Sequence, residues 1–354
     1  MAVTHSPPEV VPGWPEPPGH SVVGTPPRRP GSVRRTATID MVWPEGFGTP
    51  LQLRGRARDL LTPLRGDPIA AAEAGMIVRV GEGRTVTAIE AWPAAPTVER
   101  LVGARGGASF RSAIDDALPG EREAATPLYF LLDDIAGASL IAGFAWSRSR
   151  PAWAQGRDTG SSAARTEPHG MRKGRVICSG LRPGGYQEQA RAQGNSTPHF
   201  LRLAGDLTSP DPWAWHEIEA PPEVCMRRRR RVDVWRRGGV LRVDAHFRDS
   251  LWDVDGTELA LHEYTLEASV DRSTRRILDL VATPRVLPFP ECPGAAPHAA
   301  RLVGMPVDSF RTSVQETLRE LEACTHLNDM LRCLGEVHAL AELVEKPIAG
   351  AERC

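Results

Sequence analysis

The chain has 354 residues with a hydrophobic fraction of 41% and a charged fraction of 25%, which is the composition of a folded globular protein large enough for two ordinary domains. Its formal net charge of -1 gives no reason to expect nucleic acid as a partner. A membrane helix needs roughly 20 consecutive apolar residues, and Asp133 and Asp134 interrupt the nearest candidate, residues 128–146, so we expect no membrane association.

Residues 1–33 are rich in proline, including Pro7-Pro8 and Pro17-Pro18, and they lack apolar periodicity. They therefore predict a disordered tail with local polyproline conformation. The tail also lacks the charged and then apolar pattern of an export signal. Because the six cysteines have no regular spacing, we expect a cytoplasmic protein whose thiols are free or bind a metal.

Two stretches of the chain, residues 34–146 and 227–346, repeat one another, and residues 147–226 form a linker and connecting segment between them. Glu-Arg-Leu-Val-Gly at 99–103 corresponds to Ala-Arg-Leu-Val-Gly at 300–304, and Ser-Phe-Arg follows in both copies. Further shared motifs keep the same order along the chain. An internal repeat of this kind indicates one supersecondary unit used twice, so we predict a tandem duplication.

The second copy has the clearer pattern of secondary structure. Residues of high β-propensity predict strands over 232–235, 240–247, 259–270 and 277–282, and the Gly-Gly and Asp-Gly turns between them favour an antiparallel meander. Apolar residues at helical spacing predict two helices, over 308–321 and from Thr325 onward. Each copy is therefore expected to be α+β, with an antiparallel β-meander followed by two helices on one face of the sheet.

Several motifs are specific, above all Cys-Thr-His-Leu-Asn-Asp at 324–329 and Arg-Arg-Thr-Ala-Thr-Ile-Asp-Met at 34–41. They resemble an uncharacterised bacterial family, domain of unknown function family 2889, over most of residues 34–340. The resemblance implies no established activity. The second copy is also similar, at the level of fold, to iron–sulfur scaffold proteins with a three-stranded meander followed by helices. That similarity implies metal ligands beside a strand, in the loop before a helix and at the start of the last helix.

The second copy holds cysteine and histidine residues where the first copy has no thiol or imidazole. Cys324 and His326 stand at the start of the last predicted helix. With two further soft ligands they predict a zinc or iron site formed by His262, Cys292, Cys324 and His326. Free N–H groups at a helix N-terminus also favour a thiolate, which makes Cys324 a candidate catalytic nucleophile. The remaining interpretation is a structural pair of buried side chains.

Three charged patterns have simpler interpretations. Arg58-Asp59 and Arg248-Asp249 recur at the end of a strand in both copies, which favours an ion pair that fixes a turn, although Arg248 is also a candidate for anion binding. Asp133-Asp134 follow an apolar run and are expected on its solvent side, with acid–base or cation-binding roles as the alternative. Arg227–Arg231 lead into a strand, where some should pair with acids or bind an anionic substrate.

The sequence has no phosphate-binding loop, dinucleotide-binding glycine motif or nucleophile elbow. Abundant arginine, with lysine only at Lys173 and Lys346, suggests a GC-rich bacterial genome. We therefore predict a metal- or thiol-dependent enzyme of bacterial metabolism that acts on a small anionic organic substrate. The alternatives are a non-catalytic metal-binding or scaffold-like protein and an interaction module with structural cysteine and histidine. The sequence does not define the substrate or the oligomeric state.

Overall fold

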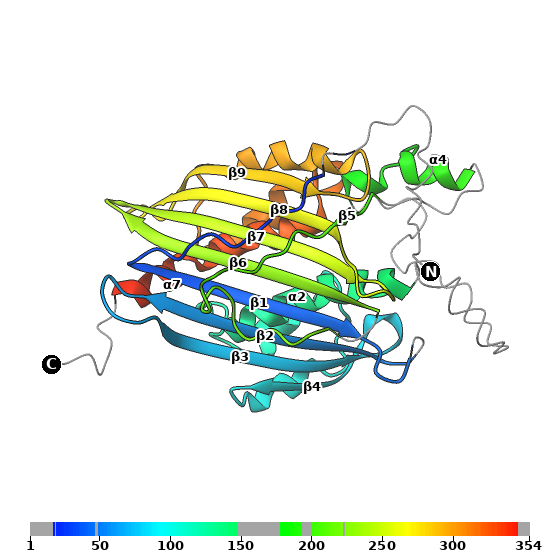
Figure 1. The fold of residues 1–354 in the computed structure, drawn as a ribbon, viewed down its shortest axis with the longest axis horizontal. Helices are drawn as coiled ribbons and strands as arrows, with labels where there is room; N and C mark the ends of the chain where they lie inside the picture. The colour runs from blue at the N-terminus through cyan, green and yellow to red at the C-terminus, as the bar shows by residue number, and fades with distance from the viewer. Residues whose placement is uncertain are drawn as a thin grey trace.

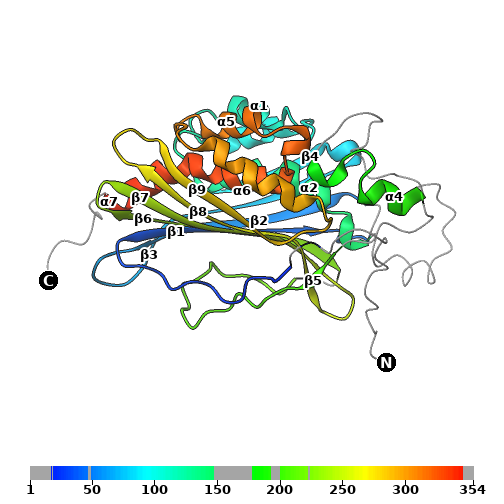
Figure 2. The same ribbon diagram turned by 90° about the horizontal axis from the view of Figure 1, so that it is seen from above.

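The strands of the protein form one antiparallel sheet (Figure 1). The computed structural model describes residues 17, 19–46, 49–146, 178–192, 200–221 and 224–345. Within these ranges the sheet has nine strands in the order β4-β3-β2-β1-β6-β7-β8-β5, and β9 pairs with β8. Helices cover one face of this sheet, so the α+β class predicted from the sequence is confirmed (Figure 2).

The first half of the molecule is a four-stranded meander followed by helices. Its strands are β1 Ser32–Val42, β2 Leu51–Thr62, β3 Ile69–Val80 and β4 Val86–Trp92. The helical elements are the short 3-10 turns η1 Glu82–Arg84 and η2 Pro96–Leu101 and the α-helices α1 Phe110–Ala117 and α2 Pro127–Ile141.

The second half likewise has four strands in a meander followed by helical elements. Its strands are β6 Cys225–Arg237, β7 Val240–Trp252, β8 Glu258–Asp271 and β9 Ile277–Val286. The helical elements are η5 Cys292–Leu302, α5 Phe310–Thr317, η6 Glu320–Glu322, α6 Thr325–Leu331, η7 Arg332–Glu336 and α7 Val337–Glu345. Between the halves lie η4 Ser179–Leu181, α4 Tyr186–Ala192 and the short strand β5 Arg202–Leu203.

Small backbone details also correspond between the halves. The isolated bridge between Thr85 and Arg105 corresponds to the bridge between Arg276 and Pro306. Each half then has a glycine with positive φ in the same loop, 87° in the first half and 84° in the second, at the Gly of the repeated Arg-Leu-Val-Gly motif. This agreement is what a tandem duplication predicts, and the duplication stays our interpretation of it.

The two halves are joined through their first strands. β1 and β6 pair in antiparallel register from Ser32 opposite Trp235 to Met41 opposite Met226. Antiparallel pairing of two corresponding strands relates the halves by an approximate twofold axis, and buried apolar residues of both halves belong to one core cluster. The predicted units 34–146 and 227–346 therefore share one sheet and one core cluster among the described residues.

The face of the sheet opposite the helices is crossed by two extended segments, residues 19–31 and 200–221 (Figure 2). The first segment is fixed by polar contacts: Ser21 Oγ donates to Glu263 Oε2 at 2.6 Å, and Arg248 Nη2 donates to the Val22 carbonyl at 2.8 Å. Residues 19–31 are therefore ordered, whereas the sequence predicts a disordered tail. Hydrogen bonds hold this segment in place, and such contacts leave no apolar periodicity in the sequence. The rest of that tail, residues 1–16 and 18, lies outside the described residues.

The connecting segment 200–221 docks on β1 through an imidazole. His216 lies between two threonine hydroxyls, with Thr36 Oγ1 2.9 Å from Nδ1 and Thr38 Oγ1 2.9 Å from Nε2. Burial lowers the pKa of His216 to about 3, so the ring is neutral at pH 7. The remainder of the predicted linker, residues 147–177, 193–199 and 222–223, lies outside the described residues.

The most apolar helix is a core helix. The helical stretch Pro127–Trp146 is long and apolar enough to cross a membrane, but 78% of its most apolar 18-residue segment is buried inside the protein. The pattern is all-round hydrophobic because α2 packs against β1, β2 and β3 on one side and against α1 and α6 on the other.

Candidate functional site

Three side chains that can bind a metal ion meet on the helix-covered face of the second half. Asp249 on β7 and His262 on β8 lie opposite each other in the antiparallel ladder, which puts both side chains on one face of the sheet. His326, in the first turn of α6, places Nε2 3.6 Å from Asp249 Oδ2. One ligand atom from each residue lies within 4.8 Å of the other two. Their exposed fractions are 0%, 8% and 8%, so the group is buried.

Local structure positions each of these side chains. The pairing of β7 with β8 shifts directly after Asp249, and such a bulge turns a side chain relative to the regular ladder. Cys324 is the N-cap residue of α6, where its carbonyl accepts from the Asn328 N–H at 2.8 Å, and this start holds His326 over the sheet. The His262 and His326 rings stack with centroids 3.5 Å apart and an interplanar angle of 17°.

Arg228 on β6 holds the carboxylate from its other side. Its Nε donates to Asp249 Oδ1 at 2.8 Å and its Nη2 to Oδ2 at 3.0 Å, a bidentate pair. Burial raises the pKa of Asp249 to about 6 against the opposing effect of Arg228. Burial also lowers the pKa of His326 to about 3, and the positive charge of Arg228 adds to this effect. His326 is therefore neutral at pH 7, which is the form that binds a metal.

The two predicted thiol ligands do not join this group. Tyr264 Oη donates to Cys324 Sγ at 3.4 Å. Gly180 packs on Cys292 so closely that a Cβ on the glycine would lie 2.5 Å from Sγ. Among the described residues, the group of ligand atoms that meets within 4.8 Å contains Asp249 and the two histidines but neither cysteine. The structure thus brings together only half of the predicted set His262, Cys292, Cys324 and His326.

The environment of Cys324 opposes its interpretation as a nucleophile. Burial raises the pKa of the Cys324 thiol, although Tyr264 and the N–H groups of Leu327 and His326 favour the thiolate. Burial also raises the pKa of Cys292 well above its ordinary value. The neutral thiol is therefore the stable form of both, whereas catalytic cysteines are kept as thiolates. The cysteines within the described residues form no disulfide: Cys178, Cys225, Cys292, Cys324 and Cys333.

The carboxylate of the site belongs to a buried ionic network between the sheet and the helices. Arg35 pairs with Asp59 across β1 and β2 in the first half, as Arg228 pairs with Asp249 across β6 and β7 in the second. Arg230 on β6 and residues of α1, α2, α5, α6 and η7 supply the remaining members. The network consists of the cations Arg35, Arg111, Arg228, Arg230, Arg311 and Arg332 and the anions Asp59, Asp133, Asp134, Asp249, Asp329 and Glu336.

Asp133 and Asp134 connect the halves inside this network. Both are 1% exposed, so the predicted position on the solvent side of an apolar run is wrong. Asp133, on α2 of the first half, accepts from Arg311 Nη1 at 2.7 Å and from Arg332 Nε at 3.1 Å, both in the second half. Arg230 Nη1 donates to Asp134 at 2.9 Å. The paired cations hold the pKa of Asp133 well below its usual range.

The repeated Arg-Asp pairs also differ from the prediction. Successive residues of a strand point to opposite faces, so Arg58 and Arg248 cannot pair with the aspartates beside them. Arg58 Nη2 donates to the Trp213 carbonyl at 2.9 Å, on the face crossed by the extended segments. Arg248 is fully buried there and pairs with Glu263 at 2.7 Å, so its charge is already neutralised by the protein. Neither arginine fixes a turn, and Arg248 has no open side for an external anion.

The same alternation explains why five arginines fit in a central strand. Arg228 and Arg230 face the helices and join the buried network. Arg227, Arg229 and Arg231 face the extended segments. Arg227 pairs with Asp40 and Arg229 with Glu258, and Arg231 pairs with both Asp233 and Asp244. The expected pairing with acids is therefore found on both faces of the sheet.

Comparison of the halves isolates the residues special to the second. Asp59 corresponds to Asp249, because each pairs with an arginine of the preceding strand and precedes a shift of register. Across the ladder, however, Asp59 faces Ala72 whereas Asp249 faces His262. Two positions after the helix N-cap, the first half has Leu128 in place of His326. Asp249 was missed in the sequence because its neighbour Arg248 suggested a local pair.

Comparisons with known proteins give a match to one family over part of the chain and no activity. No curated protein matches this chain. No solved structure matches it either. The similarity to iron–sulfur scaffold proteins therefore gains no support, whereas residues 226–340, which include Asp249, His262 and His326, match the family described as protein of unknown function (DUF2889).

Proposed function

We propose that this protein is a metal-binding protein whose second half holds one zinc or ferrous ion through Asp249, His262 and His326. The observation that carries the proposal is the convergence of these three ligand atoms within 4.8 Å from β7, β8 and α6. The corresponding positions of the first half have the same carboxylate but no imidazole. The set also lies inside the segment that matches the family.

The chemistry of the donors suits this class of ion. Two imidazole nitrogens and one carboxylate oxygen bind zinc at about 2.0–2.2 Å and also form the ligand triad of non-haem iron sites. Two imidazoles on one ion diverge from it, so the stacked rings of His262 and His326 must turn apart on binding. They can do so by side-chain rotation because they belong to different elements. Arg228 then keeps Asp249 oriented, as outer-shell groups do for metal ligands.

The surroundings favour a supporting role of the ion over catalysis. The three ligands are buried against the underside of α6. A cavity that could admit a substrate lies on the opposite face of the sheet. Cys324 offers no activated thiol. An ion here would therefore link α6 to β7 and β8. We favour this structural role over the first hypothesis from the sequence, an enzyme that acts on a small anionic substrate.

Elemental analysis of the untagged full chain tests the proposal. We expect close to one equivalent of zinc or iron, and less than a tenth of an equivalent in His326→Ala and in His262→Ala. The second variant introduces the residue that the first half has at Ala72, so it should fold. His298→Ala, on η5 and outside the group, is the matched control and should keep its metal. Circular dichroism of each variant checks that the fold is retained.

A titration completes the test. After chelation, zinc at about 100 times its dissociation constant should stabilise the chain by about 2.7 kcal/mol, which raises Tm by about 4 °C for a protein of this size. A metal-free wild-type protein whose Tm does not respond to zinc or ferrous iron would refute the proposal. Full metal content in both folded histidine variants would refute it as well.

A further inference from the structure

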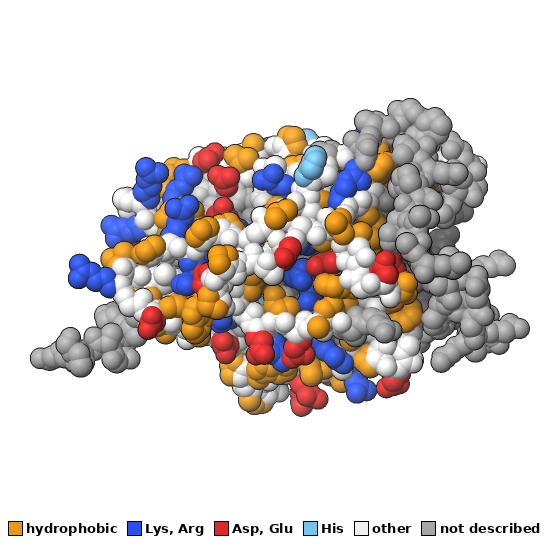
Figure 3. All heavy atoms as spheres, viewed as in Figure 1, with side chains coloured by type: hydrophobic (Ala, Val, Ile, Leu, Met, Phe, Trp, Pro, Cys, Tyr) orange, Lys and Arg blue, Asp and Glu red, His pale blue; other side chains and the backbone are white. Residues whose placement is uncertain are grey.

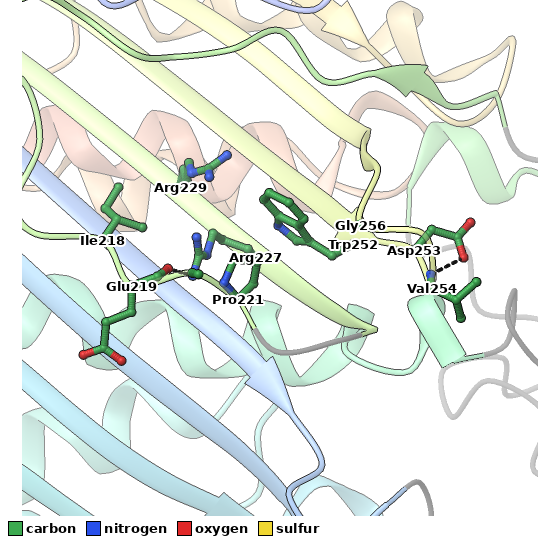
Figure 4. Close-up of a pocket in the computed structure, with 10 residues that line it drawn as sticks. Ile218, Glu219, Pro221, Arg227, Arg229, Trp252, Asp253, Val254 and Gly256 are labelled. Carbon is green, nitrogen blue, oxygen red and sulfur yellow. Dashed lines mark hydrogen bonds between the residues drawn. The ribbon is translucent and has the colours of Figure 1, made fainter.

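A cavity of about 430 Å³ lies between the connecting segment and the ends of β6 and β7. It is on the face of the sheet opposite the helices, and Figure 4 shows the side chains around it. Its volume is in the range of small-molecule sites in proteins. Because Arg227 and Arg229 line it while Arg228 points to the other face, the cavity is separate from the group around Asp249.

The cavity has one basic side chain with unused donors. Arg229 is 12% exposed, and its Nη1 donates to Glu258. Its Nε and Nη2 have no acceptor among the described residues. Burial lowers the pKa of Arg229, and Glu258 offsets this only in part. Arg227 is more fully used, because its Nε donates to Asp40 at 2.5 Å and its Nη2 to the Glu219 carbonyl at 2.8 Å.

Glu258 pairs with Arg229 through Nη1, and the two acidic side chains that line the cavity add no further negative charge inside it. In Figure 4 the Glu219 carboxylate points away from Arg227 and Arg229, and it pairs with Arg56 at 2.6 Å outside the cavity. The Asp253 carboxylate also points away and accepts from the Val254 N–H at 2.8 Å. The polar groups aimed into the cavity are therefore hydrogen-bond donors, which match an anion.

The other walls are apolar. Ile218 and Pro221 come from the connecting segment, Trp252 from the end of β7 and Val254 from the turn that follows it. The indole of Trp252 is only partly buried and offers a flat surface beside Arg229 (Figure 4). On the face seen in Figure 3, basic side chains gather at the left end, whereas basic, acidic and hydrophobic side chains are interspersed over the middle.

We propose that this cavity binds a small aromatic carboxylate, with the carboxylate on Arg229 and the ring against Trp252. An arginine with free N–H groups beside apolar walls supplies orientation, and the indole supplies contact area for a planar ring. The site is independent of the metal group, so either proposal can fail alone.

Isothermal titration calorimetry of the full chain with benzoate, benzamide and inorganic phosphate tests this proposal. Benzoate should bind one site, benzamide at least tenfold more weakly because it lacks the charge, and phosphate at least tenfold more weakly because it lacks the ring. Arg229→Gln should weaken benzoate binding at least tenfold. Arg237→Gln, an exposed arginine at the end of the same strand, is the matched control and should change it less than twofold.

A second variant keeps the test valid if Arg229→Gln destabilises the fold. Val254 is 58% exposed at the rim, so Val254→Glu should fold normally and repel benzoate at least tenfold. Equal binding of benzoate and benzamide would overturn the carboxylate assignment, and phosphate binding as tight as that of benzoate would overturn the aromatic one. Undiminished benzoate binding by Val254→Glu would overturn the location.

Discussion

Replacing Gly137 by alanine would place a methyl group inside the ionic network. Gly137 is on α2, and a Cβ there would lie 2.4 Å from Asp329 Oδ2 and 2.6 Å from Arg228 Nη1. Ordinary contact begins near 3.4 Å, so the carboxylate would have to move by about 1 Å. It cannot do so freely, because Oδ2 accepts from Arg228 at 3.0 Å and Oδ1 from Arg332 at 2.6 Å.

The free energies oppose each other in this variant. Glycine to alanine in a helix interior stabilises by about 1 kcal/mol. Breaking one partner away from a buried ion pair costs about 3–5 kcal/mol. The free energy of unfolding should therefore fall by about 2–4 kcal/mol, which corresponds to a drop in Tm of about 3–6 °C for a chain of this length.

Thermal and urea unfolding followed by circular dichroism measure this difference. Gly143→Ala is the matched control: it lies just beyond the same helix, and a Cβ there would meet no atom within 4 Å. The control should be neutral or more stable by up to about 1 kcal/mol. If Gly137→Ala were as stable as wild type, the network could yield without loss, and the argument for a rigid ionic layer between sheet and helices would be refuted.

Three further outcomes are expected. His216 has a pKa of about 3 in the folded protein and 6.5 in the unfolded chain, so the unfolded chain binds more protons and the protein becomes less stable as the pH is lowered from 6.5 towards 3. When the pH is lowered from 7.5 to 5, urea unfolding should show that the wild type loses about 2 kcal/mol more stability than His216→Gln. Equal losses in the two proteins would contradict this prediction. Deleting residues 1–31 should lower the free energy of unfolding by about 3 kcal/mol relative to a chain that starts at residue 19, because Glu263 loses its hydrogen bonds from the Ser21 hydroxyl and the Val22 N–H. An unchanged Tm would instead support the prediction that this tail is disordered. Cys292 and Cys324 should resist a thiol reagent in the folded protein at pH 7 and react on unfolding, and modification within minutes would show accessible thiolates.

The sequence predicts the elements of the fold well wherever local patterns determine them. The strands expected over 240–247 and 277–282 lie inside β7 and β9, and α5 begins within the helix expected from 308. What it does not predict is the partner of each charge. Arg230 is paired with Asp134, 96 residues away, and nothing near either residue in the chain reveals the contact. The run Arg227–Arg231 was therefore predicted to precede a strand, although it lies inside β6.

The candidate site was predicted in part for the same reason. His262 and His326 were identified because the second copy has imidazoles that the first lacks. Cys324 was included because it stands beside His326 in sequence, but a helix N-cap and the residue two positions later point in different directions. Asp249 could have been found by alternation alone, since a strand that turns Arg248 to one face must turn Asp249 to the other.

The central pairing of β1 with β6 has a consequence for how the chain is made. Arg34 on β1 contacts Asp233 on β6, 199 residues later. At about 5–20 residues per second, synthesis reaches β6 about 10–40 s after β1 leaves the ribosome. Throughout that interval the first meander has an open edge, the kind of edge that recruits other nascent chains. Arg34 and Arg35 lie along it, and charged side chains on an edge strand prevent such pairing. The arginines that join the halves in the folded protein therefore also protect the exposed edge of β1 from pairing with other chains during synthesis.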